Sequence, residues 1–172
     1  RVRVAFCFPD TYEIGMSNVG MRILYGLMNR MDGVWCERVF HPWGDMEEEM
    51  RKHQLPLWAL ESQDPVKDFD MIAFTIGYEM AYSNILNMLD LSGVPLRSKD
   101  RDGLKNIVFA GGVCAFNPEP LADFVDFFSI GEGEDITPEI IALYDRAKAE
   151  NWTKQEFLFA VSKIPGVYVP SF

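Results

Sequence analysis

Short apolar runs alternate along this chain with stretches of helical period, and this alternation is the strongest constraint on its fold. Parallel strands need long crossover connections, usually helices, so the pattern is typical of α/β domains. One run, at residues 71–76, is almost continuously apolar, which indicates a strand buried on both faces. The sequence therefore predicts a doubly wound, mostly parallel sheet of about five strands, at residues 2–8, 34–40, 71–76, 107–110 and 124–130.

Capping residues indicate where several helices begin. After a polar loop, Ser17 is expected to cap the first helix. Thr137 and Pro138 suit the N-cap and first position of a helix that runs to about residue 148, and Thr153 with Glu156 forms a capping box for a last helix. Further helices are expected at residues 45–53 and 78–89, and a strand-like segment at 167–169.

The length of the chain limits the number of domains that it can form. The chain has 172 residues, of which 48% are apolar, which suits one hydrophobic core and a small appendage. We therefore expect a binding domain at residues 1–150, followed at 151–172 by a capping helix and a linker. Two independent catalytic domains do not fit this length.

The net charge and the cysteine content restrict which partners and which cellular compartment suit this chain. The formal net charge of −10 disfavours a nucleic acid or an anionic membrane surface as the main partner, because both are polyanions. No apolar run reaches the length of a membrane span, and the amino-terminal residues lack the features of a signal peptide. Three scattered cysteines fit a reducing environment, so a cytoplasmic location is expected.

Four loops are expected at the carboxyl ends of the strands, where open parallel sheets bind their ligands. Three of them contain glycines that follow a strand directly, which lets the backbone approach a large ligand. The alternative is that these glycines only form tight turns. The loops span residues 9–17, 77–80, 111–120 and 131–134.

The first of these loops carries the most specific motif. Asp10, Tyr12 and Gly15 occupy the positions of Asp-x-His-x-x-Gly, and this segment resembles that signature of the cobalamin-binding Rossmann-like domain. In that family the histidine is the lower axial ligand of cobalt. Neutral phenol is a weak ligand, so the resemblance implies cobalamin bound without a histidine ligand.

Three later motifs narrow the resemblance. The segment at residues 75–77, Thr-Ile-Gly, stands where the family has Ser-x-Leu, and Gly111-Gly112 matches a glycine pair that lines the nucleotide tail of the cofactor. Gly-Glu-Gly-Glu at residues 131–134 opens the helix that follows the fifth strand. Together these motifs resemble the amino-terminal domain of cobalamin-binding-type radical SAM proteins, which implies a Rossmann-like (flavodoxin-like, cobalamin-binding type) fold over nearly the whole chain.

The resemblance implies a cofactor- or substrate-binding module that is not catalytic alone. Its partner would be a downstream radical SAM barrel in the same protein, which would hold a 4Fe-4S cluster and S-adenosylmethionine. The alternative is a module that has lost cobalamin and serves as a lid, a substrate-recruiting surface or a homodimer interface. The candidate contact residues, taken from these motifs and the loops beside them, are Asp10, Tyr12, Gly15, Thr75, Gly77, Glu79, Gly111, Gly112, Gly131, Glu132, Gly133 and Glu134.

Each acidic candidate has a second interpretation. Asp10 orients a ligand or forms an Asx-turn, and Glu79 is a ligand contact or an acid at a helix start. Glu132 and Glu134 contact ligand hydroxyls or amides, or only complement the helix dipole. The residues alone leave these alternatives open.

The cysteines and histidines are weaker candidates. Cys7, Cys36 and Cys114 are 29 and 78 residues apart, so they cannot form the local loop of a radical SAM cluster. Related methylthiotransferases hold a second cluster with three scattered cysteines, whereas buried thiols are ordinary inside strands. His41 and His53 lie outside the four loops. The sequence therefore indicates no metal ligands and no catalytic residue.

Two other α/β classes do not fit the residues. A flavodoxin needs a hydroxyl-rich phosphate loop after the first strand, whereas residues 9–15 contain one threonine and two acids. A receiver domain needs an aspartate at the end of the third strand and a lysine at the end of the fifth. Here Asp70 begins the third strand and Gly131 ends the fifth.

Overall fold

The protein is an α/β domain, described over residues 1–172 by a computed structural model. Its strands are β1 (Val2–Phe8), β2 (Val34–Phe40), β3 (Met71–Thr75), β4 (Ile107–Gly111), β5 (Phe127–Ser129) and β6 (Val167–Tyr168). Its helices are α1 (Tyr12–Ser17), α2 (Val19–Asn29), α3 (Gly44–Lys52), α4 (Tyr82–Leu91), α5 (Gly133–Ala149) and α6 (Lys154–Val161). Five short 3₁₀ turns lie between these elements, at Val66–Asp68, Glu79–Ala81, Ser98–Asp100, Val113–Phe116 and Glu119–Leu121.

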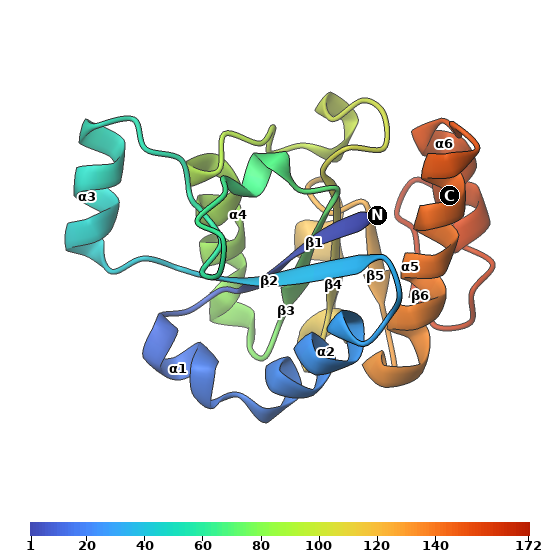
Figure 1. The fold of residues 1–172 in the computed structure, drawn as a ribbon, viewed down its shortest axis with the longest axis horizontal. Coiled ribbons are helices and arrows are strands. Elements are labelled where there is room, and N and C mark those ends of the chain that lie inside the picture. Colours follow the sequence, from blue (N-terminus) through green and yellow to red (C-terminus); the bar gives the residue numbers. More distant parts are fainter.

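The six strands form one sheet in the order β2-β1-β3-β4-β5-β6 (Figure 1). The first five strands are parallel, and β6 pairs antiparallel with β5. This arrangement confirms the predicted mostly parallel, Rossmann-like sheet and adds one short antiparallel strand to it. The order places β3 and β4 at the centre, which explains why residues 71–76 are almost continuously apolar.

Helices cover both faces of the sheet, and each face has its own core. On one face, α4 packs Ile85, Met88 and Leu89 into a cluster with the side chains of β1 and β3. On the other face, α2, α5 and α6 contribute the buried side chains, among them Tyr144 and Phe157. Because α6 belongs to this second core and β6 to the sheet, residues 151–172 pack on the same unit. The boundary expected at residue 150 stays a prediction.

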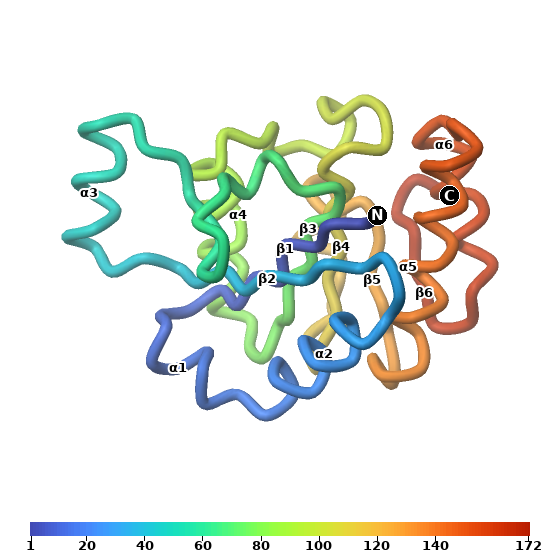
Figure 2. The backbone as a smooth tube through the Cα atoms, viewed as in Figure 1, coloured from blue at the N-terminus to red at the C-terminus, as the bar shows by residue number.

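Helix α3 projects from the sheet like an arm (Figure 1). The backbone leaves the end of β2, forms α3 and returns through the segment before β3 (Figure 2). The arm is joined to α4 by Arg51, which donates to Asp90 at 2.9 Å and to Asn87 at 2.7 Å. None of the helices combines the length and the apolar character that crossing a bilayer requires.

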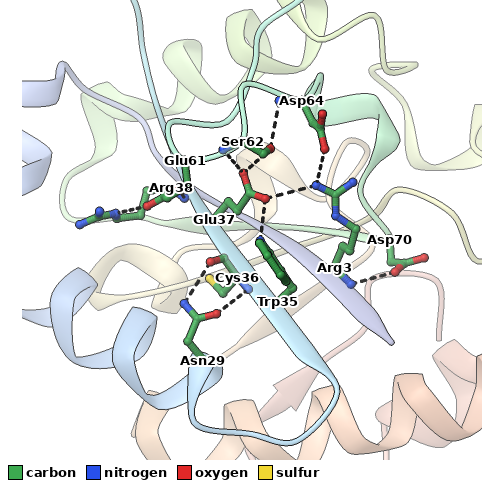
Figure 3. A network of polar contacts seen from close by, with 10 residues as sticks. All are labelled: Arg3, Asn29, Trp35, Cys36, Glu37, Arg38, Glu61, Ser62, Asp64 and Asp70. Atoms are coloured by element: carbon green, nitrogen blue, oxygen red, sulfur yellow. Dashed lines mark hydrogen bonds and ion pairs between the residues drawn. The ribbon is translucent and has the colours of Figure 1, made fainter.

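The outer edge of β2 is closed by side chains (Figure 3). The side-chain amide of Asn29 hydrogen-bonds both the backbone carbonyl and the backbone N–H of Cys36. The backbone N–H of Arg38 donates to the carboxylate of Glu61. The carboxylate of Glu37 is fully buried and accepts hydrogen bonds from four donor groups, on Arg3, Trp35 and Ser62. A second strand could pair with this edge only by displacing these contacts.

Several expected boundaries are wrong, by between one residue and more than one helical turn. The loop expected to be polar contains α1, and Asn18 rather than Ser17 caps α2, because its side chain accepts from the backbone N–H of Met21. Helix α5 begins at Gly133, so Thr137 and Pro138 lie inside it instead of at its start. The fifth strand covers only Phe127–Ser129, and α4 begins at Tyr82 after a 3₁₀ turn. Propensity places such boundaries poorly because tertiary packing overrides it.

Candidate functional site

A pocket of about 330 Å³ lies at the carboxyl ends of β3, β4 and β5, between α2 and α5. Pockets of this size and position are typical of ligand sites in open α/β sheets. The lining residues are Phe6, Asn18, Gly20, Leu24, Met28, Ala73, Phe74, Thr75, Ile76, Gly77, Phe109, Gly111, Gly112, Val113, Ser129, Gly131, Gly133, Glu134 and Thr137.

Glycines shape the entrance of this pocket. At Gly112 the backbone has a φ of +103°, and a Cβ there would lie 2.7 Å from the carbonyl oxygen of Ile76, so only glycine fits. At Gly77 a Cβ would meet no atom within 4 Å. The glycines therefore do two things: Gly112 lets two loops approach each other, and Gly77 leaves space open at the pocket.

The lining of the pocket is mainly apolar and carries few polar groups. Phe6, Leu24 and Phe109 contribute apolar walls, and Thr75, Ser129 and Thr137 contribute hydroxyl groups. Glu134 is the only ionisable side chain in the lining. Such a lining favours a largely uncharged ligand group, because no cation is present to pair with an anion.

The structure brings seven of the twelve candidate residues to this pocket and leaves the other five outside. The seven come from the ends of β3 and β4 and from the start of α5: Thr75, Gly77, Gly111, Gly112, Gly131, Gly133 and Glu134. The five come mainly from the first loop: Asp10, Tyr12, Gly15, Glu79 and Glu132.

The first loop packs against the ends of β1 and β2 rather than against the pocket. The ring of Tyr12 makes an edge-to-face contact with Phe40, with ring centroids 5.4 Å apart. At Gly15 a Cβ would lie 2.3 Å from the Phe40 ring, so glycine is required for α1 to sit there. The carboxylate of Asp10 accepts from the backbone N–H of Thr11 at 2.7 Å, one residue on instead of the two residues of an Asx-turn, and from the hydroxyl of Tyr78 at 3.0 Å. This last hydrogen bond raises the pKa of Tyr78.

The two remaining acids lie beside the pocket. Glu79 accepts a hydrogen bond from the side chain of Asn117 at 3.3 Å, which links the loops after β3 and β4. Glu132 occupies the N-cap of α5, and its side chain makes no capping hydrogen bond. Both therefore lie at the carboxyl-terminal rim without lining the pocket.

Sequence reasoning missed several lining residues, among them Asn18, Ser129 and Thr137. The sequence predicts Thr137 as a helix cap, and Ser129 is a single small residue inside a predicted apolar strand, so neither stands out as a binding residue. The available signal is position: Ser129 precedes the Gly-Glu-Gly-Glu motif by two residues, and Thr137 follows it by three. The apolar walls carry no sequence signal that separates them from the core.

The cysteines do not come together. Cys7 lies in the core on one face of the sheet and Cys36 in the core on the other. Burial raises the pKa of both thiols. Cys114 lies half-buried after β4. No group of three or more histidine, cysteine, aspartate or glutamate side chains is arranged to hold a metal ion.

Both histidines lie away from the pocket. His41 lies at the end of β2, where its ring hydrogen-bonds the carbonyl of Pro42 and the side-chain amide of Asn87, each at 2.9 Å. His53 lies at the end of α3 and contacts Glu49 at 3.2 Å. The contact with Asn87 joins the segment between β2 and α3 to α4, whereas the contact of His53 lies within α3 and its C-cap.

A larger cavity, of about 540 Å³, lies beside the amino-terminal ends of β4 and β5. Its most buried polar group, the carboxylate of Asp126, accepts from the backbone N–H of Val108 at 2.7 Å and from the hydroxyl of Ser98. Asp126 also forms ion pairs with Lys154 at 2.7 Å and with Arg101 at 3.3 Å. Because this carboxylate is saturated by protein groups, we assign the smaller pocket, not this cavity, as the candidate site.

Comparisons with known proteins place the domain in a family. An uncharacterised protein of Methanocaldococcus jannaschii is 27% identical over 143 residues, which cover 80% of this chain and 26% of that protein. The fold is similar to that of a radical S-adenosylmethionine methyltransferase, TsrM, from Kitasatospora setae, solved with a tryptophan substrate and a SAM analogue bound. That likeness has a TM-score of 0.59 at 13% identity and covers 98% of this chain and 28% of that one.

The chain thus spans about a quarter of the length of each of these two proteins. Residues 20–170 match the family model described as "Radical SAM proteins, N-terminal". That match covers most of the fold, including the whole candidate site except Phe6 and Asn18. The chain therefore belongs to the family of N-terminal domains of radical SAM proteins.

Proposed function

We propose that this domain is the cofactor-binding module, of cobalamin type, of a radical SAM enzyme. The observation that carries the proposal is the pocket of about 330 Å³ at the ends of the central strands, which seven of the twelve candidate residues line. Its position, between α2 and α5 and beyond β4, suits an extended ligand that inserts one end between the helices.

The residues of the pocket fit the heterocyclic base at the end of the nucleotide tail of cobalamin. Gly77 and Gly111 leave space at the entrance, because a Cβ on the first would meet nothing within 4 Å and a Cβ on the second would meet only Ser129, at 3.5 Å or more. Thr75, Ser129 and Thr137 offer hydroxyl groups to a heterocyclic base, and the apolar walls exclude water from it. When bound, cobalamin would supply carbon–cobalt chemistry, and this domain would hold and orient it.

The domain has no histidine to ligate cobalt. Tyr12 stands at the histidine position of the motif and packs against Phe40, outside the pocket. The proposal is therefore restricted to cobalamin held through its tail, without a protein histidine on the cobalt.

A 4Fe-4S cluster does not fit this chain. Cys7 and Cys36 are buried on opposite faces of the sheet, and no metal-binding group of side chains is present. The cluster and S-adenosylmethionine are therefore assigned to a downstream domain of the same protein.

The face that would meet such a domain is the carboxyl-terminal edge of the sheet, which includes the pocket. Large apolar side chains lie exposed on the segments that follow β1 to β4: Tyr12, Ile14, Val19, Trp43, Tyr78, Met80, Val113 and Phe116. Met80 is the most exposed of them, at 82%. Exposed apolar residues gathered on one rim are typical of an interaction surface, which supports a domain packed over the pocket.

Titration with hydroxocobalamin tests the proposal. The chain is mixed with hydroxocobalamin, with and without a reductant, and the corrinoid absorbance is followed during the titration and through gel filtration. We expect saturable spectral change and co-elution at one corrinoid per chain. Absence of binding in every cobalt oxidation state would overturn the proposal.

A second function is favoured by the packing of the first loop. With Tyr12 turned toward Phe40 and large apolar residues exposed on the rim, the domain also suits a role as a lid, a substrate-recruiting surface or a homodimer interface. This alternative gains support if corrinoid does not bind while light scattering shows a dimer that Met80→Glu or Phe116→Glu dissociates.

A further inference from the structure

A chain of hydrogen bonds joins the end of β2, the arm formed by α3, and helix α4. His41 directly follows β2, and its ring nitrogen Nδ1 lies 2.9 Å from the carbonyl oxygen of Pro42. The other ring nitrogen, Nε2, lies 2.9 Å from the side-chain nitrogen of Asn87 on α4. The amide oxygen of Asn87 accepts in turn from Arg51 on α3 at 2.7 Å. Asn87 therefore connects both the start and the end of the arm to α4.

The donors and acceptors of this chain match only when the imidazole of His41 is neutral. The carbonyl of Pro42 can only accept, so Nδ1 of His41 carries the proton. The oxygen of Asn87 is occupied by Arg51, so the NH₂ group of Asn87 faces His41 and donates to Nε2. Each of these groups then has a partner of the opposite kind.

The charged group nearest in effect to His41 is Glu47 on α3, which accepts from Arg51 at 3.1 Å. Burial disfavours the ionised carboxylate, but hydrogen bonds from Arg51 and Asn87, with the proximity of Arg51 and His41, outweigh it and lower the pKa of Glu47. From the first loop, Asp10 offers His41 a backbone carbonyl at 2.9 Å, and its carboxylate accepts from other groups. Glu47 is therefore the anion to which a protonated His41 is drawn.

A second proton on His41 breaks this match. Histidine ordinarily changes its charge between about pH 5 and 8, and the added proton turns Nε2 into a donor that faces the NH₂ group of Asn87. If the amide of Asn87 turns round, its NH₂ group faces the guanidinium of Arg51. If the ring turns toward Glu47, it leaves Asn87. Either response removes one contact between the arm and α4, while the pair of Arg51 with Asp90 stays.

We propose that His41, Asn87 and Arg51 form a pH-sensitive latch, which holds the α3 arm on α4 at neutral pH and loosens when His41 is protonated. The arm carries the exposed apolar side chains of Trp43 and Met46, so the latch sets the position of two groups at the surface. This inference goes beyond the proposed function and does not depend on a bound cofactor.

Hydrogen exchange of the backbone amides of α3 tests the latch. Their protection factors are measured by NMR between pH 8 and pH 5, with the intrinsic exchange rate corrected at each pH. We expect protection to fall by about three- to tenfold toward pH 5, the range of one hydrogen bond. In His41→Gln protection should stay level, because the amide takes up no proton. Unchanged protection in the unaltered chain, or an equal fall in His41→Gln, would overturn the proposal.

The second histidine of the chain supplies the matched control. His53 lies at the C-cap of α3, and its ring contacts only Glu49 of the same helix, at 3.2 Å. His53→Gln should therefore keep the full pH-dependent fall in protection. A fall that disappears in His53→Gln and persists in His41→Gln would assign the effect to the wrong histidine for this latch and refute it.

A variant at Asn87 should reverse the sign of the effect. Asn87→Asp replaces the NH₂ group by a carboxylate oxygen, which accepts from protonated His41 while the other oxygen accepts from Arg51. Protection of α3 should then rise as the pH falls from 8 to 5. A fall as large as that of the unaltered chain would contradict the role of the Asn87 amide. If this variant does not fold, the comparison of the unaltered chain with His41→Gln decides the proposal by itself.

Discussion

The two cavities of this domain differ in the polar groups that line them. At the amino-terminal ends of the strands, Asp126 receives four partners, among them Arg101 and Lys154, while the Nε of Arg101 is buried without a partner. At the carboxyl-terminal ends, Ser129 and Thr137 are each 6% exposed and line the pocket, and neither hydroxyl is sealed from solvent without a partner. The charged groups around the larger cavity therefore pair with one another, whereas the smaller pocket has apolar walls with a few hydroxyl groups.

Cavity size alone therefore does not identify a binding site in this domain. The cavity at Asp126 is larger, yet its deepest charges are already neutralised. Substitutions among the paired charges around a cavity alter the free energy of unfolding. Substitutions in a binding pocket alter ligand affinity instead.

The largest effect is expected from breaking the network at the amino-terminal ends. Asp126→Ala leaves Arg101 and Lys154 buried without a counter-charge, and we expect a loss of about 3–5 kcal/mol in the free energy of unfolding, measured by denaturant titration. The control is Asp123→Ala, because Asp123 makes an exposed pair with Arg97 and should contribute about 1 kcal/mol or less. Equal losses in the two variants would contradict a structural role for the buried network.

The next effect separates binding from stability. Gly77→Leu places a side chain in the open space at the pocket, so affinity for hydroxocobalamin should fall by about tenfold or more, roughly 1.4 kcal/mol, with the unfolding midpoint unchanged. Gly44→Leu is the matched control, because a Cβ at Gly44 also meets nothing within 4 Å but lies on α3, far from the pocket. Equal affinity in both variants would show that the pocket is not the cofactor site.

The smallest effect concerns a pH-dependent contact beside the larger cavity. The Glu156 carboxylate accepts from the backbone N–H of Thr153 at 2.7 Å and from its hydroxyl at 2.9 Å, and these hydrogen bonds lower the pKa of Glu156. Since the folded pKa lies below the unfolded one, the stabilisation is present at neutral pH and is lost as the pH falls through the folded pKa.

The Thr153 amide shift, followed by NMR during acid titration, should report this loss. Glu156→Gln should flatten the titration, because the amide does not ionise in this range. A titration of the Thr153 amide that persists unchanged in this variant would assign the effect to another group.

Much of the fold could be predicted from sequence because its signals are local. Strands β1 and β2 match the apolar runs at residues 2–8 and 34–40, and the capping box of Thr153 and Glu156 forms as expected. The start of the helix that follows Gly-Glu-Gly-Glu is predicted five residues late, since Thr137 and Pro138 are favourable start residues in any sequence. Packing against α2 extends the helix back to Gly133.

The candidate site was predicted in part for the same reason. Glycines that directly follow strands carry a local signal, and Gly77, Gly111 and Gly131 all reach the pocket. The first loop carried an equally local motif, but its residues pack against Phe40 instead. A motif gives residue types and spacing, and the direction of a loop depends on contacts with distant strands.

The sequence by itself determined the α/β class, the approximate strands and the glycine-rich rim, because these depend on periodicity and on conformations that few residues adopt. The tertiary structure alone decided which polar groups pair with one another and which line the pocket. Asp126 and Thr137 are both polar residues in apolar surroundings along the chain, yet the first meets partners from three distant segments and the second lines the pocket. Hydrogen bonds between residues far apart in sequence exist only after the strands take their order in the sheet, so that distinction lies beyond any local pattern.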